Sequence, residues 1–173
     1  MQTKEKDKKK NKLIIILSIV IVVLLAVGTW FFFFKQPDKI IPDYVKESNA
    51  QEMGDDDSKK MEKPDGGGAV SLLYSKNVKV NLSDSRVSLF VGNPKKSTQD
   101  IVLQVLIDEN VIAQSGRLVP GYQVDELTID KNAKTILTKG GYKGKIKIFY
   151  FDETGGKKAM LNTEIPVSIE VNE

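Results

Sequence analysis

The sequence predicts an all-β fold: a single antiparallel β-sandwich of about seven or eight strands, preceded by one transmembrane helix and a flexible linker. Three observations support this. Leu13 to Phe34 is an uncharged apolar run, residues 35–68 are rich in proline, glycine and charge, and residues 69–173 hold short alternating apolar runs between turn residues. Period-two alternation is typical of strands with one buried face. Several short strands with hairpin turns and almost no helical periodicity predict a sandwich.

The apolar run is long enough to span a bilayer. Its only polar residues are Ser18 and Thr29. At about 1.5 Å per residue the helix would be roughly 33 Å long, against a hydrocarbon core of about 30 Å. We therefore expect residues 13–34 to be a membrane span in contact with lipid.

Lysines are concentrated on one side of this span. Six precede it, at positions 4, 6, 8, 9, 10 and 12, whereas only Lys35 and Lys39 follow closely. The positive-inside rule keeps residues 1–12 in the cytoplasm as a basic tail and exports the rest. The predicted location is the cell membrane, with a single pass, a cytoplasmic N-terminus and an extracytoplasmic C-terminal domain.

A cleaved signal peptide is the alternative, with Leu13 to Leu25 as its apolar region and Ala26-Val27-Gly28 as the cleavage site. Cleavage there would leave Thr-Trp-Phe-Phe-Phe-Phe at the mature N-terminus, an apolar tail that a soluble protein would have to hide. The anchor is therefore favoured. A lipoprotein is excluded, because lipidation of that kind needs a cysteine and the chain has none.

Composition removes most kinds of chemistry. Without cysteine or histidine the chain has no disulfide, no thiol nucleophile and neither the commonest general base nor the usual zinc ligand. The net charge of +3 belongs to the basic tail, so the exported part is nearly neutral and nucleic-acid binding is not expected. We expect no catalytic, cofactor or metal site and no enzyme activity.

Residues 35–68 have the composition of a linker. A flexible coil of this length has a root-mean-square span of roughly 30 to 35 Å. The run Asp55-Asp56-Asp57 is contiguous, unlike the alternating ligands of a calcium loop, and indicates solvated charge. A short helix around Asp43 to Met53 is compatible with the sequence but has too few apolar residues to dock strongly.

The domain, residues 69–173, begins with three alternating runs. Their apolar faces are Val78, Val80 and Leu82, then Val87, Leu89 and Val91, then Ile101, Leu103, Val105 and Ile107. Further strands are expected at residues 111–114, 123–129 and 142–151, separated by the turn signals Asp108-Glu109-Asn110, Pro120-Gly121, Gly140-Gly141 and Gly155-Gly156.

The last strand shows the longest alternation. Its expected buried face is Ala159, Leu161, Thr163, Ile165, Val167, Ile169 and Val171. Pro166, on the other face, cannot donate to a ladder and predicts an edge, a bulge or a break. Upstream, Leu137 followed by Gly140-Gly141-Tyr142 resembles a tyrosine corner, in which the hydroxyl bonds back to the backbone. The alternative is a tyrosine that simply begins a strand.

These features together carry a resemblance. They are Asn93-Pro94, the run Val102 to Ile107, Ser115-Gly116-x-Leu118-x-Pro120-Gly121, Leu137 with Gly141-Tyr142, and a closing Val-Ser-Ile-Glu-Val. Over about residues 87–171 the chain is similar to small immunoglobulin-like β-sandwich proteins tethered to the membrane of Gram-positive bacteria. The resemblance implies this fold and carries no activity or functional residues with it.

One surface stands out as a candidate site. Lys143, Lys145, Lys147, Phe149 and Phe151 share one face of a strand, opposite Gly144, Ile146, Ile148 and Tyr150. If the second set is core, the first projects outward as a basic row beside an aromatic pair, able to hold an anionic polymer or a partner protein. The alternative is that a loop or the linker covers the phenylalanines and the lysines form a solvated edge that discourages aggregation.

Two functions follow as expectations. The first is a membrane-anchored extracytoplasmic interaction module, a structural or accessory component of a cell-envelope complex. The second is a binding module for an anionic cell-wall polymer or glycan.

Overall fold

The computed structural model describes residues 17, 20–24, 44–54, 59–154 and 156–173. The chain divides into two compact units, Met1–Ile41 and Pro42–Glu173. In the first unit, residues 17 and 20–24 have helical backbone and exposed apolar side chains. Among the described residues, no helix is long and apolar enough to cross a membrane. The basic tail and most of the span predicted over residues 13–34 lie outside the described residues.

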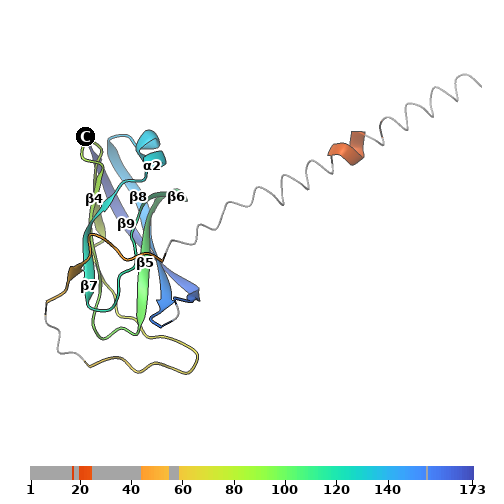
Figure 1. Ribbon diagram of the computed structural model, residues 1–173. Coiled ribbons are helices and arrows are strands. Elements are labelled where there is room, and N and C mark those ends of the chain that lie inside the picture. The colour runs from red at the N-terminus through yellow and green to blue at the C-terminus, as the bar shows by residue number, and fades with distance from the viewer. Residues whose placement is uncertain (1–16, 18–19, 25–43, 55–58, 155) are drawn as a thin grey trace, which may run out of the picture. The chain divides into compact units, whose positions relative to one another are not determined.

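The second unit is mostly β (Figure 1). Its described residues form the strands β1 (Gln51–Glu52), β2 (Leu73–Tyr74), β3 (Asn77–Asn81), β4 (Arg86–Asn93), β5 (Gln99–Ile107), β6 (Asn110–Gln114), β7 (Tyr122–Thr128), β8 (Gly140–Asp152) and β9 (Lys158–Asn172), with the helix α2 (Lys131–Ile136). They make one sheet in the order β1-β7-β4-β3-β9-β8-β5-β6, with β2 paired to β4.

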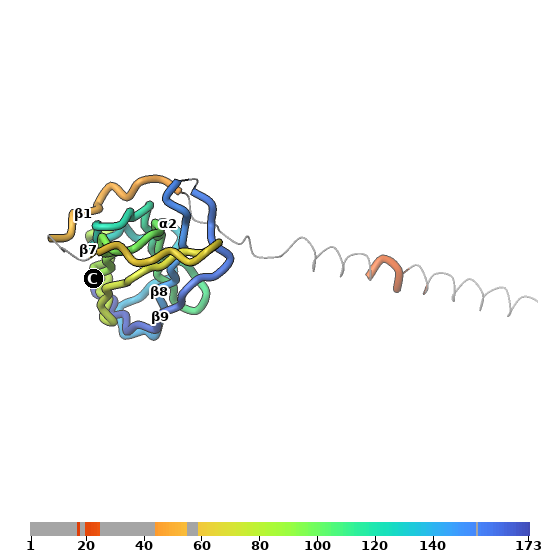
Figure 2. The backbone as a smooth tube through the Cα atoms, turned by 90° about the horizontal axis from the view of Figure 1, so that it is seen from below, coloured from red at the N-terminus to blue at the C-terminus, as the bar shows by residue number. Residues whose placement is uncertain are grey.

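The sheet is mixed, which corrects the prediction of a purely antiparallel sandwich. β3 and β9 pair in parallel, from Asn77 opposite Ser168 to Asn81 opposite Asn172, while the other described strand pairs are antiparallel. Side chains alternate with period two in both kinds of pair, so the pattern could not separate them. The sheet curls, and viewed from below β1 and β7 lie on the other side of the unit from β8 and β9 (Figure 2).

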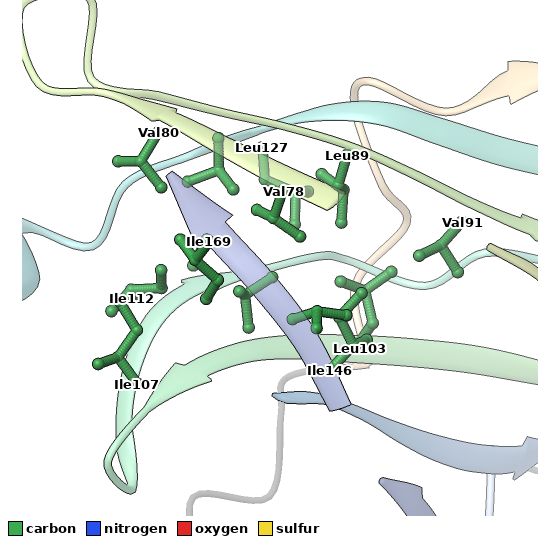
Figure 3. Packing of buried hydrophobic residues seen from close by; sticks show 14 of the residues in the cluster. Val78, Val80, Leu89, Val91, Leu103, Ile107, Ile112, Leu127, Ile146 and Ile169 are labelled. Carbon is green, nitrogen blue, oxygen red and sulfur yellow. The ribbon is translucent and has the colours of Figure 1, made fainter. Parts of the chain in front are cut away.

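The main apolar core lies between the two halves of the curled sheet (Figure 3). The apolar faces predicted for β3, β4 and β5 are buried, except at Leu82, which is half-buried and follows the end of β3. Ile146 and Ile148 of β8 are fully buried in the same cluster. The alternation therefore assigned the inner face of these strands correctly at the other positions, although β5 is buried on both faces from Asp100 to Ile107.

The predicted tyrosine corner is confirmed. The hydroxyl of Tyr142 donates to the backbone oxygen of Thr138 at 2.9 Å. The segment just before the corner contains α2, a helix that the sequence pattern did not predict. Asp130 caps this helix with its side chain, and Ala133 and Leu137 are buried. Six residues are too few to show a helical period.

The last strand follows the prediction over most of its length. Alternate residues from Ile165 to Val171 are buried, but Leu161 is 79% exposed. The reason is a bulge: Phe149 lies opposite Asn162, whereas Phe151 lies opposite Lys158, so β9 holds extra residues between these pairs. A bulge disrupts the pleat locally and redirects its side chains.

Pro166 lies on an edge, as one of the predicted options required. Ser168 donates its N–H to the backbone oxygen of Lys76 at 2.9 Å, so it points toward β3. Because strands repeat every two residues, Pro166 faces the same way, and β3 begins only at Asn77, opposite Ser168. Proline therefore stands where β9 has no strand beside it to receive an N–H.

Part of the predicted linker lies against the sheet. Residues 44–54, here called the N-terminal strap, form bridge and strand pairs on either side of a turn at residues 48–49, where a short helix was considered. Lys46 pairs with Arg117, β1 pairs with β7, and the Met53 N–H donates to the Gly121 oxygen at 2.8 Å. The compact unit therefore begins before Ala69, the boundary expected from composition. Residues 35–43 and 55–58 of the predicted linker lie outside the described residues.

Candidate functional site

The predicted site residues lie on the outer face of β8, between β5 and β9. Lys143 is exposed, and Lys145 and Lys147 are half-buried. Along this face Lys147 lies opposite Gln104 of β5 and Glu164 of β9. The row of lysines predicted from the sequence is therefore present. It lies on an interior strand of the sheet, because β8 has a neighbouring strand on each side.

Acidic side chains pair with two of the three lysines. Lys145 Nζ lies 2.6 Å from Glu109 Oε1 and 3.2 Å from Glu164 Oε2, and Lys147 Nζ lies 3.3 Å from Glu164 Oε1. The hydrogen bond to Glu109, followed by that to Glu164, raises the pKa of Lys145. The hydrogen bond from Lys145 is the main cause that lowers the pKa of Glu164. The row therefore offers less positive charge to an anion than the sequence indicated.

The two phenylalanines do not project into solvent. Phe149 is 5% exposed and Phe151 is 2% exposed, and together with Val102 they form a small second apolar cluster. The exposed aromatic pair is therefore not found, and the alternative stated above, in which a loop or the linker covers the two phenylalanines, is confirmed. Alternation placed both rings on the outer face, as found.

The cover is Tyr44 of the N-terminal strap. Its ring centroid lies 4.9 Å from that of Phe151 at a tilt of 34°, and the guanidinium carbon of Arg117 lies 4.9 Å from the Tyr44 ring centroid. On a further side the ring meets Gly156, where an added Cβ would approach the ring to 2.7 Å. Gly156 has φ +61°, so both its conformation and its contact require glycine.

Tyr44, Asp100 and Arg117 make one polar cluster, called the latch below. The Tyr44 hydroxyl donates to Asp100 Oδ2 at 2.5 Å, and Arg117 Nε lies 3.8 Å from the same oxygen. Burial raises the pKa of Asp100, although the hydrogen bond from Tyr44 and the charge of Arg117 act against this. Burial likewise raises the pKa of Tyr44, with the Asp100 hydrogen bond adding to it.

A second contact fixes the strap beside the latch. The buried carboxylate of Glu47 accepts hydrogen bonds from the backbone N–H groups of Asn49 at 2.8 Å and Gly116 at 2.5 Å. A Cβ on Gly116 would lie 2.6 Å from the backbone oxygen of Val45. Glycine is therefore needed at 116 for the two backbones to approach.

Sequence reasoning missed the latch. One signal was available: Tyr44 is the only aromatic residue between Phe34 and Tyr74, which is unusual in a segment expected to be solvated. Asp100 and Arg117 gave no signal, because each stands alone among strand and turn residues and the fold alone brings them together.

Two shallow depressions lie on the described surface. One, of about 530 Å³, is lined by outward residues of β3, β8 and β9, among them Lys79, Lys143 and Glu170. The other, of about 460 Å³, is lined by residues that include Lys60, Asp100 and Glu153 beside the latch. The described residues hold no group of acidic side chains placed to bind a metal ion.

The latch is suited to holding a segment. The hydroxyl of Tyr44 and the carboxylate of Asp100 are hydrogen-bonded to each other, while the guanidinium of Arg117 lies against the Tyr44 ring and 3.8 Å from the carboxylate. A nucleophile with an adjacent general base, the arrangement of covalent catalysis, needs a group left to attack a substrate. The latch geometry therefore supports docking of the strap.

No protein-family model matches the chain, and no curated protein matches it. Among solved structures, the Escherichia coli chaperone DraB is 16% identical, with a TM-score of 0.38, over 59% of this chain and 54% of that one. The periplasmic chaperone SfaE is 12% identical, with a TM-score of 0.32, over 60% and 56%. AggA, the major subunit of an Escherichia coli aggregative adherence fimbria, is 11% identical, with a TM-score of 0.27, over 65% and 100%.

These matches show a distant similarity to immunoglobulin-like chaperone and pilin domains and assign no family. The chain spans about half the length of the two chaperones that it matches.

Proposed function

We propose that the protein is a membrane-anchored, extracytoplasmic interaction module of immunoglobulin-like fold, a structural or accessory component of a cell-envelope complex with no enzymatic activity. The observation that supports the proposal is that the polar side chains around the strap bind the strap itself. Tyr44, Asp100 and Glu47 fasten the chain's own N-terminal segment to the sheet. A domain that is fixed to the segment leading to its anchor is suited to presenting a rigid surface at a constant distance from the membrane.

The anchor part of the proposal is supported by the uncharged run from Leu13 to Phe34 and the lysines that precede it. We expect protease added to intact protoplasts to remove the domain and leave a membrane-embedded stub. A tag after Glu173 should be lost in this experiment, while a tag before Met1 should survive. Survival of the C-terminal tag would contradict the export of the domain.

A second candidate, binding of an anionic wall polymer or glycan, is supported by the depression beside Lys143. This lysine and Lys79 line the same surface, with Glu170 as the acidic side chain among the lining residues. If the depression holds a polyanion, replacing both lysines with glutamine should abolish retention on wall polymer at low salt. The matched control is the pair Lys131→Gln and Lys134→Gln on α2. Equal retention by the two double variants, or none by the parent, would leave the interaction module as the proposal.

A further inference from the structure

Among the described residues of the compact unit, the most exposed apolar pair lies on the β8–β9 hairpin. Met160 is 96% exposed and Leu161 is 79% exposed. Both lie in the β9 bulge described above, between the pairs Phe149–Asn162 and Phe151–Lys158. In the rest of β9 from Ile165 onward, apolar side chains are buried. The bulge therefore turns two apolar residues outward, and this placement calls for a partner.

The turn of the hairpin has an excess of basic side chains. Its two acids are paired: Asp152 with Lys63 at 3.1 Å and Glu153 with Lys60 at 3.0 Å. Within residues 152–161 no further acid balances the adjacent Lys157 and Lys158. An apolar pair flanked by lysines is the composition of a surface that inserts shallowly into an anionic bilayer.

The sequence between the proposed span and the hairpin's support on the strap is short. The hairpin rests on Tyr44 through Gly156, and only nine residues, 35–43, separate Tyr44 from the end of the apolar run at Phe34. Extended chain covers at most about 3.3 to 3.6 Å per residue, so, if the proposed anchorage holds, Tyr44 can be no more than roughly 35 Å from the membrane surface. The far end of the unit, at α2, is separated from the hairpin by the full length of β8 (Figure 1).

We infer that the hairpin tip, defined as residues 153, 154 and 156–161, docks on the anionic surface of the same membrane through Met160 and Leu161, with the exposed Lys157 contacting lipid phosphates. This inference rests on the proposed membrane anchorage. It gives the domain a fixed orientation, with the tip against lipid and the α2 end directed away.

The test uses the full chain, in which the lack of cysteine allows a single dye to be attached at Thr154→Cys. The labelled protein is reconstituted in vesicles of equal phosphatidylcholine and phosphatidylglycerol that contain headgroup-nitroxide lipid. We expect loss of most of the fluorescence through quenching. The loss should disappear in the double variant Met160→Ser and Leu161→Ser, and it should persist in the control Ile136→Ser, which alters an exposed apolar residue on α2. It should weaken in pure phosphatidylcholine vesicles.

The outcomes separate this inference from the proposed anchorage. If the chain does not float with vesicles, the anchorage fails. If it floats and the dye at 154 is unquenched, or is quenched equally in the double serine variant, the docking of the tip is wrong. Protection of the dye from iodide on native membranes without quenching by nitroxide lipid would show a protein partner at the tip and would also overturn the inference.

Discussion

Tyr44 changes the character of a surface more than 50 residues away in the sequence. It is the hydrogen-bond partner of Asp100 and covers Phe151. Alternation in β8 showed correctly that Phe149 and Phe151 lie opposite Ile146 and Ile148, because pleating alone determines this. What lies on the outer face depends on long-range contacts, which a local pattern does not contain.

The latch predicts a particular dependence of stability on pH. Because burial raises the pKa of Asp100 above the ordinary 3.8, the folded state takes up a proton at a higher pH than the unfolded state. The contribution of Asp100 to stability therefore rises as the pH falls through its folded-state pKa and is lost at higher pH. The melting temperature of the parent minus that of Asp100→Asn should increase from neutral pH toward mildly acidic pH.

That comparison has an internal control. Glu126→Gln alters an exposed ion pair with Arg86, which contributes little to stability, so its difference from the parent should stay nearly constant over the same range. A difference for Asp100→Asn that shrinks on acidification would show that the carboxyl pKa is not raised.

The buried positions found by alternation predict large costs on truncation. Ile146 is fully buried, and its replacement by alanine should lower the free energy of unfolding by about 2 to 5 kcal/mol, since a cavity is left in the core. Leu161→Ala, at a position that the same rule placed on the buried face, should change stability by no more than about 0.5 kcal/mol because this side chain is exposed. Urea denaturation of both variants measures the contrast. Similar values for the two would contradict the bulge in β9.

At the scale of elements, the strap is part of the folded unit. A fragment beginning at Ala69 lacks Tyr44 and β1, so it uncovers Phe149 and Phe151 and leaves Asp100 without its tyrosine partner. We expect it to be less stable than a fragment beginning at Pro42 by about 3 kcal/mol, the lower end of the cost of removing a buried aromatic side chain, because Tyr44 is half-buried.

Single substitutions at Tyr44 separate the contribution of its hydroxyl from that of its ring. Tyr44→Phe keeps the ring and removes only the hydroxyl, so the longer fragment should lose about 1 to 3 kcal/mol through the buried carboxylate left behind, and Tyr44→Ala should lose more. Equal stability of the two fragments in urea denaturation would mean that the strap does not dock in solution.

Elements differed in how far the sequence could predict them. Pro166 indicated an edge because the absence of an N–H is a local property, and the edge is found. The parallel pairing of β3 with β9 gave no signal, since Val78, Val80 and their counterparts in β9 alternate as antiparallel strands do. The strap was missed because its docking depends on backbone hydrogen bonds and one tyrosine, which composition does not register.

For the whole molecule, composition predicted the fold class well and the length of the free linker poorly. The β-rich unit was predicted from its alternating runs, whereas the length of the free tether was overestimated. A coil over residues 35–68 would span roughly 30 to 35 Å on average and far more when stretched. With the strap docked, and with residues 13–34 spanning the membrane as proposed, the sequence between Phe34 and Tyr44 would limit the distance from the membrane to Tyr44 to roughly 35 Å.

The position of β9 in the sheet bears on how the protein can reach its folded state. β9 is the last of the described strands in sequence, yet it lies between β3 and β8 and joins the two halves of the sheet. If the C-terminal part is exported as proposed, Lys158–Asn172 is the last of these strands to cross the membrane. Until it crosses, the half-sheet that contains Val80 and the half-sheet that contains Ile146 lack the strand that connects them. Closure of the sheet must therefore wait for β9, and the apolar faces of the two halves are exposed to aggregation in that interval.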